Sequence, residues 1–151
     1  MQTLIKQRGI AAVEAAIVLP IMALLLVASA EFGRAFYQSN TLTKATEDGA
    51  RYLADQVGFG DTGQMAPLDI LKDVIERAKN LVVYGHPNPA DGKEPLLPGK
   101  KEDFKITITP NGTHFSVSVN YTYQPIFGTS LPFTSIATTF NFQPTVTMRV
   151  L

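Results

Sequence analysis

The chain has 151 residues, of which 45% are hydrophobic and 17% are charged, a length and composition that suit one compact domain in addition to one membrane-spanning segment. Basic and acidic residues number 13 each and cancel to a net charge of zero, so the composition gives no overall attraction to nucleic acid. The absence of cysteine excludes disulfide bonds, thiol catalysis and cysteine-based metal sites.

The N-terminal region contains an apolar run from Ile10 to Ala30 that is long enough to cross a membrane. Within it, the residues that are not plainly apolar are Glu14, Pro20 and Ser29. A helix of this length extends roughly 31 Å at ~1.5 Å per residue, which matches a hydrocarbon core of about 30 Å. Pro20 has no N–H group to bond the preceding turn, so we expect it to bend the helix inside the membrane.

The charges that precede this run predict its orientation. The segment before Ile10 carries Lys6 and Arg8 and no acidic residue. The positive-inside bias therefore keeps the N-terminus in the cytoplasm and exports the C-terminal region. A cleavable secretory signal, with Ala28-Ser29-Ala30 as its cleavage site, is the alternative. A membrane anchor that the protein retains is favoured over a secretory signal, because the run is long for a signal peptide and helical periodicity continues without a break through residues 32–52.

Glu14 is the costly residue of the run, because an acidic side chain at the centre of a bilayer costs ~2.5 to 3.5 kcal/mol and less near the interface. One interpretation is that it reaches the cytoplasmic headgroups and favours the positive end of the helix dipole. The other is that cleavage after Gly9 makes Ile10 a new N-terminus, and that Glu14 neutralises this amine in an adjacent subunit. Glycine suits the position before such a cut, because a protease that grips an extended backbone tolerates no side chain there.

Five short motifs follow one another in the first third of the chain. They are Arg8-Gly9, Ala12-Val13-Glu14, Leu19-Pro20, Glu31-Phe32-Gly33-Arg34 and Gly49-Ala50-Arg51-Tyr52. The ordered set, from Arg8 to Ala54, resembles the N-terminal block of TadE-like proteins, which are minor pilins or pseudopilins of the tight-adherence (Tad, type IVc) pilus. Two later stretches, residues 117–125 and 145–151, resemble the C-terminal halves of the same family.

This resemblance implies that residues 1–9 are a leader, which a prepilin peptidase removes by cutting between Gly9 and Ile10 on the cytoplasmic side. Lys6 and Arg8 are then the basic residues beside the cut, and Glu14 is a residue of subunit assembly. The implied location is the inner membrane of a bacterium, with some of the protein in the extracellular pilus. The implied partners are the prepilin peptidase, other pilins and minor pilins of the Tad system, and the Tad assembly platform.

Beyond Ala30 the pattern becomes amphipathic and predicts a helical extension over residues 31–57, which gives one helix from Ile10 to Gln56. The residues expected on its packed face are Phe32, Phe36, Leu42, Ala45, Gly49 and Leu53. The residues expected in solvent are Glu31, Arg34, Lys44, Glu47 and Asp48. Gly33 and Gly49 are expected to let neighbouring helices approach, and the glycine-rich residues 58–63 are expected to end the helix.

The remaining pattern predicts that residues 31–151 form a pilin-like α+β domain. Pro67 opens a second helix over residues 67–83, whose apolar stripe packs on a sheet or on the first helix. Residues 84–103 form a surface loop rich in proline. Residues 104–151 alternate in polarity, which predicts an antiparallel sheet of about three to four strands, with Pro144 in an edge strand or a bulge. The side chains expected to face inward from one strand are Phe115, Val117, Val119, Tyr121 and Tyr123.

The sequence contains no combination of residues that indicates catalysis. His86 lies in the proline-rich loop and His114 on the polar side of a strand, and both are expected in solvent. Residues 91–94 lack the alternating oxygen ligands of a calcium loop and are interpreted as a turn. We therefore expect no enzymatic activity, no cofactor and no metal site, and neither nucleic acid nor a small-molecule substrate as a partner.

These features favour a minor pilin that sits in the inner membrane and enters, primes or caps a Tad pilus for surface adhesion. In this mechanism the helix from Ile10 to Ala30 exchanges lipid for the helices of other subunits. A periplasmic binding or chaperone-like module that stays tethered to the membrane fits the topology equally well and predicts no dependence on Glu14. An exported enzyme is a further alternative, which would require a catalytic site.

Overall fold

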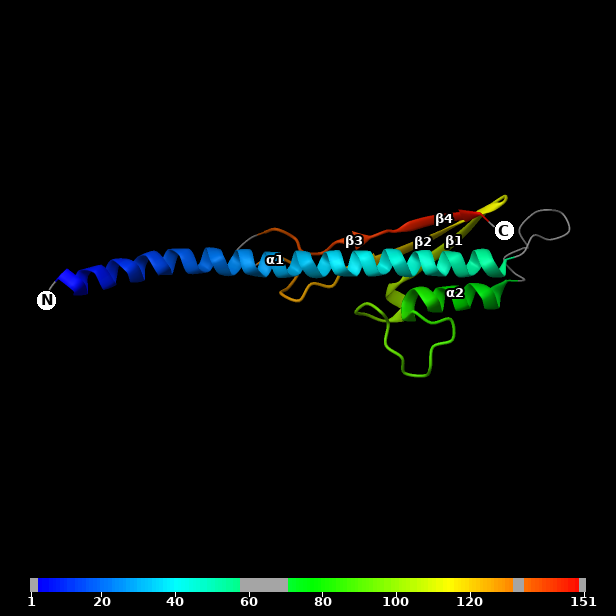
Figure 1. Cartoon of the computed structure of the whole chain (residues 1–151), viewed down its shortest axis with the longest axis horizontal. Helices are drawn as coiled ribbons and strands as arrows, with labels where there is room; N and C mark the ends of the chain where they lie inside the picture. Colours follow the sequence, from blue (N-terminus) through cyan, green and yellow to red (C-terminus); the bar gives the residue numbers. More distant parts are fainter. Residues whose placement is uncertain (1–2, 58–70, 132–134, 150–151) are drawn as a thin grey trace. The chain divides into compact units, whose positions relative to one another are not determined.

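The computed structural model describes residues 3–57, 71–131 and 135–149, with their side chains from residue 9 onward. Its elements are α1 (Thr3–Gln56), α2 (Lys72–Tyr84), the 3₁₀ helix η1 (Lys101–Asp103), β1 (Lys105–Asn111), β2 (His114–Thr122), β3 (Asn141–Phe142) and β4 (Thr145–Arg149) (Figure 1). The predicted α+β class, with a long apolar helix, a second helix and an antiparallel sheet, is confirmed. The chain divides into two compact units. One consists of residues 1–35 and 125–139, and the other, hereafter the sheet-bearing unit, consists of residues 36–124 and 140–151.

α1 starts earlier than the sequence predicted and ends at the predicted residue. It begins at Thr3 rather than Ile10 and ends at Gln56. Pro20 lies inside the helix, which continues on both sides of it. The bend expected at Pro20 stays a prediction. The glycines expected to end the helix, and the start of a second helix at Pro67, lie outside the described residues.

α2 ends at a glycine cap. The helix runs from Lys72 to Tyr84, one residue beyond its predicted end. Gly85 follows with a φ of 67°, a left-handed conformation that glycine adopts without a side-chain clash. Its N–H group donates to the carbonyl of Leu81 at 2.9 Å. The loop predicted over residues 84–103 is confirmed for residues 86–100, which contain no helix or strand. Its ends are corrected, because Tyr84 belongs to α2 and residues 101–103 form η1.

The buried face of α1 differs in part from the predicted face. The predicted positions that are buried are Leu42, Ala45, Gly49 and Leu53. Phe32 and Phe36 are 56% and 68% exposed, so their assignment to the packed face is wrong. Phe36 and Leu42 are six residues apart, a rotation of about 240° at ~3.6 residues per turn, and therefore cannot share one face. The buried positions that complete the face in the sheet-bearing unit are Gln38, Thr46, Ala50 and Ala54.

β2 is the central strand of the sheet. It pairs in antiparallel fashion with β1 along one edge and with β3 and β4 along the other. Its inward side chains are buried as predicted, and they are Phe115, Val117, Val119 and Tyr121, followed by Tyr123. Hydroxyl pairs join β2 to β4 on the opposite face, between Ser116 and Thr147 at 2.8 Å and between Ser118 and Thr145 at 2.9 Å. The sheet thus has one packed apolar face and one polar face.

Pro144 lies between β3 and β4 and does not shift the register in which these two strands pair with β2. The pairs on either side of it are Tyr121 with Phe142 and Ser118 with Thr145, so no extra residue is inserted. The N–H group of Val119 donates to the carbonyl of Pro144 at 3.1 Å, but proline has no N–H group to return the bond. Of the two predicted roles, the structure therefore shows an edge strand and not a bulge.

Two clusters of buried side chains hold the sheet-bearing unit together. One gathers around Leu53, Ala78 and Phe115, and the other around Leu42 and Val82. Each cluster contains residues of α1, α2 and β2, so α2 packs on the first helix and on the sheet at once. Both packing partners predicted for the second helix are therefore used. Each large apolar side chain that becomes fully buried contributes roughly 1.5–3 kcal/mol to the free energy of unfolding.

Gly49 sets the closest approach of α1 and α2. A Cβ atom added to Gly49 would lie 2.6 Å from Cγ2 of Val82 and 3.2 Å from the carbonyl oxygen of Ala78. The helix that approaches this glycine is therefore α2 of the same chain. Gly33 differs, because a Cβ atom added there meets no atom within 4 Å.

We expect Gly49→Ala to lower the free energy of unfolding by about 1–3 kcal/mol, because the added methyl group must displace Val82 or separate the two helices. Gly33→Ala is the control, since it adds the same group in open space and should stabilise the helix by up to about 1 kcal/mol. Thermal unfolding of both variants in detergent, followed by circular dichroism, measures the difference. Equal melting temperatures would contradict the packing role of Gly49.

The hydroxyl of Tyr121 is a buried polar group on the inner face of the sheet. It donates a hydrogen bond to the carbonyl of Pro98 at 2.8 Å and lies 3.3 Å from Oε1 of Gln38. The Tyr121 ring stacks on Phe104, with ring centroids 5.0 Å apart. One side chain of β2 thereby connects the sheet to α1 and to the loop of residues 86–100.

Tyr121→Phe should lower the free energy of unfolding by about 0.5–1.5 kcal/mol, because the part-buried hydrogen bond to the carbonyl of Pro98 is lost while the ring packing remains. The matched control is Tyr37→Phe, since Tyr37 is exposed. Urea denaturation of both variants, followed by circular dichroism, provides the measurement. The role of the hydroxyl is refuted if Tyr121→Phe unfolds at the wild-type urea concentration.

Candidate membrane and assembly site

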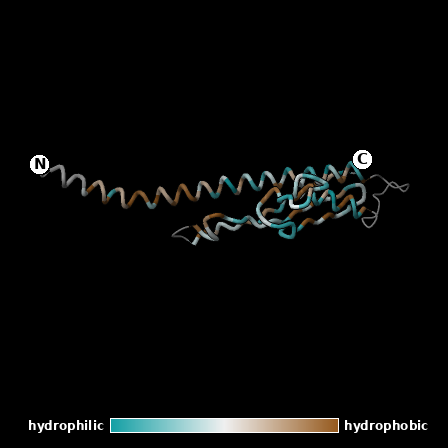
Figure 2. The backbone as a smooth tube through the Cα atoms, turned by 90° about the horizontal axis from the view of Figure 1, so that it is seen from below, coloured by the Kyte–Doolittle hydropathy of each residue, from teal (hydrophilic) through white to brown (hydrophobic). Residues whose placement is uncertain are grey.

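Between residues 10 and 30, α1 consists mainly of apolar residues (Figure 2), and most of them are exposed. The large side chains exposed on it are Ile10, Val13, Ile17, Val18, Leu19, Ile21, Met22, Leu25 and Leu26. By length and composition the helix can cross a membrane, and its most apolar stretch is not buried. Contiguous apolar surface of this size is rarely exposed to water by a soluble monomer. It fits a membrane-anchored protein.

The residues that the sequence assigns to cleavage and assembly lie at the start of this surface. Gly9 and Ile10 have helical backbone, and a Cβ atom added to Gly9 meets no atom within 4 Å. Glu14 is exposed and lies about one turn from Ile10, on the same side of α1. The side chains of Lys6 and Arg8 lie outside the described part of the chain. The arrangement leaves Glu14 accessible to a partner molecule.

Glu31 is the largest departure from the predicted arrangement. The sequence places it in solvent, whereas the residue is only 4% exposed. Its Oε1 atom accepts hydrogen bonds from the backbone N–H groups of Ile126 and Phe127, each at 2.8 Å. Charge-assisted bonds of this kind are roughly twice as strong as neutral ones and offset the cost of burying a carboxylate. The prediction fails because these donors come 95 and 96 residues later in the chain, a separation that no local pattern reveals.

The donors to Glu31 belong to residues 125–139, hereafter the return loop, which lies beside α1 in the same unit (Figure 1). Its two arms pair with each other through the N–H of Leu131 to the carbonyl of Ile136 and the N–H of Thr138 to the carbonyl of Thr129, each at 3.0 Å. The hydroxyl of Thr138 also donates to the carbonyl of Gly128 at 2.6 Å. These bonds hold the two described arms of the return loop, residues 125–131 and 135–139, side by side.

The motif residues at 31–34 and 49–52 divide between packed and exposed positions. Those that pack inside their unit are Glu31, Gly49, Ala50 and, partly, Arg34 and Tyr52, whereas Phe32, Gly33 and Arg51 are exposed. The side chain of Tyr52 and the charge of Asp73, which forms an ion pair with Arg77 of α2 at 2.9 Å, raise the pKa of the Arg77 guanidinium. Part of the motif set therefore serves to pack the chain's own helices, a role that the sequence did not indicate.

The charged groups of α2 and η1 form surface pairs. Glu76 accepts hydrogen bonds from Lys79 at 3.2 Å and from Lys101 at 3.3 Å. The bond from Lys79, supported by Lys101, lowers the pKa of the Glu76 carboxyl despite its partial desolvation. All three side chains are about one-third exposed or more, so these pairs contribute little to stability. They line a hollow whose apolar wall is formed by Val83, Phe104 and Ile106.

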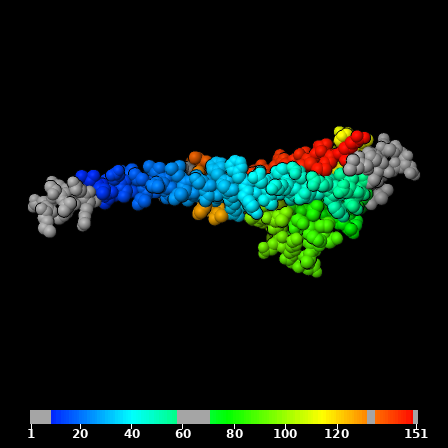
Figure 3. Space-filling model, viewed as in Figure 1, coloured from blue at the N-terminus to red at the C-terminus, as the bar shows by residue number. Residues whose placement is uncertain are grey.

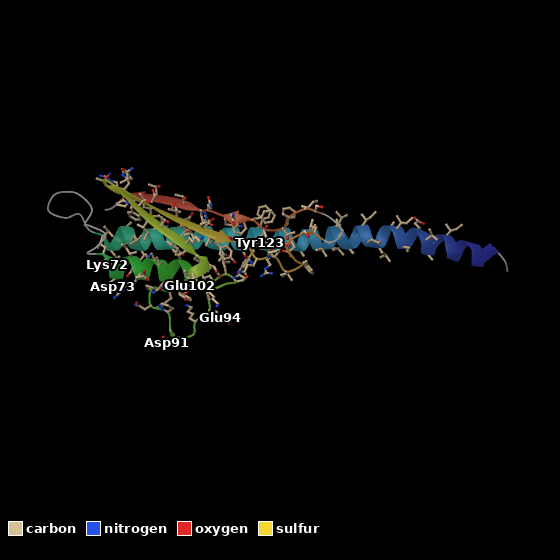
Figure 4. The ribbon with its side chains drawn as sticks, turned by 180° about the vertical axis from the view of Figure 1, so that it is seen from behind. Lys72, Asp73, Asp91, Glu94, Glu102 and Tyr123 are labelled. Carbon is tan, nitrogen blue, oxygen red and sulfur yellow. The ribbon has the colours of Figure 1, made fainter. Side chains whose placement is uncertain are left out.

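The part of the chain that the structure describes holds no group of three or more side chains that could bind a metal ion. His86 and His114 are both exposed, as predicted. The turn predicted at residues 91–94 is confirmed, with Gly92 at a φ of 79°. Figure 4 shows the labelled charged side chains, Lys72, Asp73, Asp91, Glu94 and Glu102, spread over α2, the loop and η1. They do not converge on one site.

Residues 9–51 match a family model described as TadE-like protein. The match includes most of the motifs from which the resemblance was predicted, and it confirms that resemblance for this segment. Comparison with curated proteins and comparison with solved structures give no significant match. Together with the apolar helix, the TadE-like segment fits a membrane-anchored protein.

Proposed function

We propose that this chain, whose residues 9–51 are TadE-like, is a minor pilin or pseudopilin that takes part in the assembly or function of a Tad (type IVc) pilus for surface adhesion. The observation that carries the proposal is the exposed apolar surface of α1. Hydrocarbon solvates this surface in the bacterial inner membrane, and the helices of other pilins cover it in a filament. The protein acts through these contacts and through the Tad assembly platform, and not as an enzyme.

Processing acts at Gly9. Residues 1–9 lie in the cytoplasm, where Lys6 and Arg8 retain the leader and a prepilin peptidase cuts between Gly9 and Ile10. The first turns of α1 must unwind before this cut, because the backbone is helical here and a protease requires it extended. Gly9 favours unwinding, since glycine is about 1 kcal/mol less favourable than alanine inside a helix. The open space around Gly9 supports its access to a protease.

Assembly uses Glu14. Cleavage creates an α-amino group on Ile10, and the carboxylate of Glu14 in an adjacent subunit neutralises it as the two helices pack. An acidic side chain left alone in the centre of a bilayer costs ~2.5–3.5 kcal/mol, so the paired arrangement is favoured over two separate charges. The exposure of Ile10 and Glu14 on one side of α1 supports this pairing. It also makes assembly depend on prior cleavage.

Gly9→Phe should block removal of residues 1–9, because the aromatic side chain obstructs an extended backbone in the peptidase. Mass spectrometry of the protein extracted from membranes of cells with an active prepilin peptidase should show a wild-type chain that begins at Ile10 and a variant that begins at Met1. Gly33→Phe changes another helical glycine with open surroundings and should be processed normally. A wild-type chain that retains Met1 in such cells would refute the proposed cleavage.

Glu14→Ala should leave processing intact and reduce incorporation into the pilus about tenfold or more, since the loss of ~1.4 kcal/mol from one ion pair shifts an equilibrium tenfold. Immunoblots of sheared pili and of the membrane fraction measure the ratio of assembled to unassembled protein.

Glu47→Ala is the control for this variant, because Glu47 is an exposed acid of the same helix outside the apolar run. Equal incorporation of the two variants would contradict the role of Glu14. A processed wild-type chain that inserts in the membrane but is absent from sheared pili would favour a tethered binding or chaperone-like module over a filament subunit.

A further inference from the structure

The return loop carries an exposed apolar surface that neither the cleavage nor the helix packing uses. Ile126, Phe127 and Ile136 are 63%, 49% and 61% exposed. Residues 125–139 contain no charged side chain. Figure 3 shows parts of this loop, in orange, on both sides of α1. An apolar surface without charges that adjoins an apolar helix is suited to an environment poor in water.

Several backbone N–H groups of the return loop have acceptors within the protein. Those of Ile126 and Phe127 donate to Glu31, and those of Leu131 and Thr138 donate between the two arms of the loop. The hydroxyl of Thr138 is likewise bonded to a carbonyl of the loop. Non-helical backbone at membrane depth requires such internal pairing, because hydrocarbon offers no hydrogen-bonding partner.

The return loop overlaps the outer end of the apolar run. Glu31, which holds the loop, directly follows Ala30. On the same face of α1, partial burial extends back to Ala28, Val27 and Leu24, whereas the other positions from 10 to 30 are exposed. Leu24 lies about 9 Å before Ala30 along the helix at ~1.5 Å per residue. Segments that lie in a membrane interface bury their apolar face to a similar depth, about 5–10 Å.

We propose that the return loop binds the lipid surface, with Ile126, Phe127 and Ile136 in the boundary between headgroups and acyl chains, and with Glu31 as the residue that positions the loop. The inference rests on the membrane insertion of α1 proposed above. The loop has no charge with which to select a headgroup, so its ligand is the bilayer interface itself. Contact on the Glu31 face fixes the depth and rotation of α1 before assembly, and thereby determines which helix face meets other subunits.

The absence of native cysteine allows a single fluorescent label to be placed at will. The variants Phe127→Cys and Ile136→Cys carry an environment-sensitive dye on the return loop. Met22→Cys reports on the membrane span, and Asp91→Cys reports on an exposed loop of the other unit. The full chain is reconstituted in vesicles of phosphatidylethanolamine and phosphatidylglycerol. Quenching by lipids that bear a nitroxide near the headgroup is compared with quenching by iodide present on both sides of the membrane.

The proposal predicts that labels at Phe127 and Ile136 are quenched by the nitroxide lipid and protected from iodide, whereas the label at Asp91 shows the reverse. Labels at Phe127 and Ile136 that iodide quenches as strongly as the label at Asp91 would overturn the proposal, while protection at Met22 leaves membrane insertion intact. Labels protected from both quenchers would overturn it in favour of a contact with a second protein chain. If the label at Met22 is also open to iodide, the membrane insertion fails as well.

Glu31→Ala tests how the loop is positioned. With the label at Phe127, this variant should lose most of the nitroxide quenching and gain iodide quenching, because the N–H groups of residues 126 and 127 lose their acceptor. Glu31→Gln keeps an acceptor oxygen and should retain most of the wild-type quenching. Unchanged quenching in Glu31→Ala would overturn the assignment of Glu31 as the positioning residue. The label at Met22 should behave alike in all three proteins and verifies that each is inserted.

Discussion

α1 carries more apolar surface than the other described residues cover. In the sheet-bearing unit, α2 and β2 bury one face of the helix through two clusters of side chains. In the other unit, the face of α1 that contains Glu31 is partly covered at Leu24, Val27 and Ala28. The remaining positions from 10 to 30 stay exposed. The apolar surface that remains requires hydrocarbon or other helices, because transfer to water costs free energy in proportion to area. In the proposed function, the same surface serves first a membrane anchor and then a filament subunit.

The TadE-like segment combines two kinds of constraint in one helix. Gly49 and Ala50 are internal, since α2 passes so close to Gly49 that a methyl group there would meet Val82. Phe32 and Arg51 are exposed on other faces. The motifs therefore contain residues that pack α1 on its own chain, such as Gly49, and residues that α1 exposes on its surface, such as Phe32. Assembly contacts are accordingly expected among the exposed positions.

Glu31 shows how one acidic side chain gains a structural role at the end of an apolar run. Burial of a carboxylate is costly, and two N–H groups at 2.8 Å offset this cost. The bonds hold the return loop against the helix, where the loop adds apolar side chains beside the apolar run. Glu14 lies in the same run but is exposed, and it has no comparable contact within the described residues that would explain its presence. Glu14 and Glu31 thus differ in kind: Glu31 has its partner within the chain, and the proposed partner of Glu14 lies in another.

The sequence by itself determined the features that depend on composition and local period. The apolar length of Ile10–Ala30, the helix end at Gln56, the alternation of β2 and the TadE-like motifs all follow from residues close together in the chain. The tertiary structure decided the rotation of α1 and the partners of its polar residues. Phe36 keeps a helical period with Phe32 but not with Leu42, and it is exposed because α2 packs on the face that contains Leu42 and Gly49. Glu31 is buried because the N–H groups of Ile126 and Phe127 donate hydrogen bonds to its carboxylate. These donors lie 95 and 96 residues later in the chain, and local periodicity carries no information about contacts at that separation.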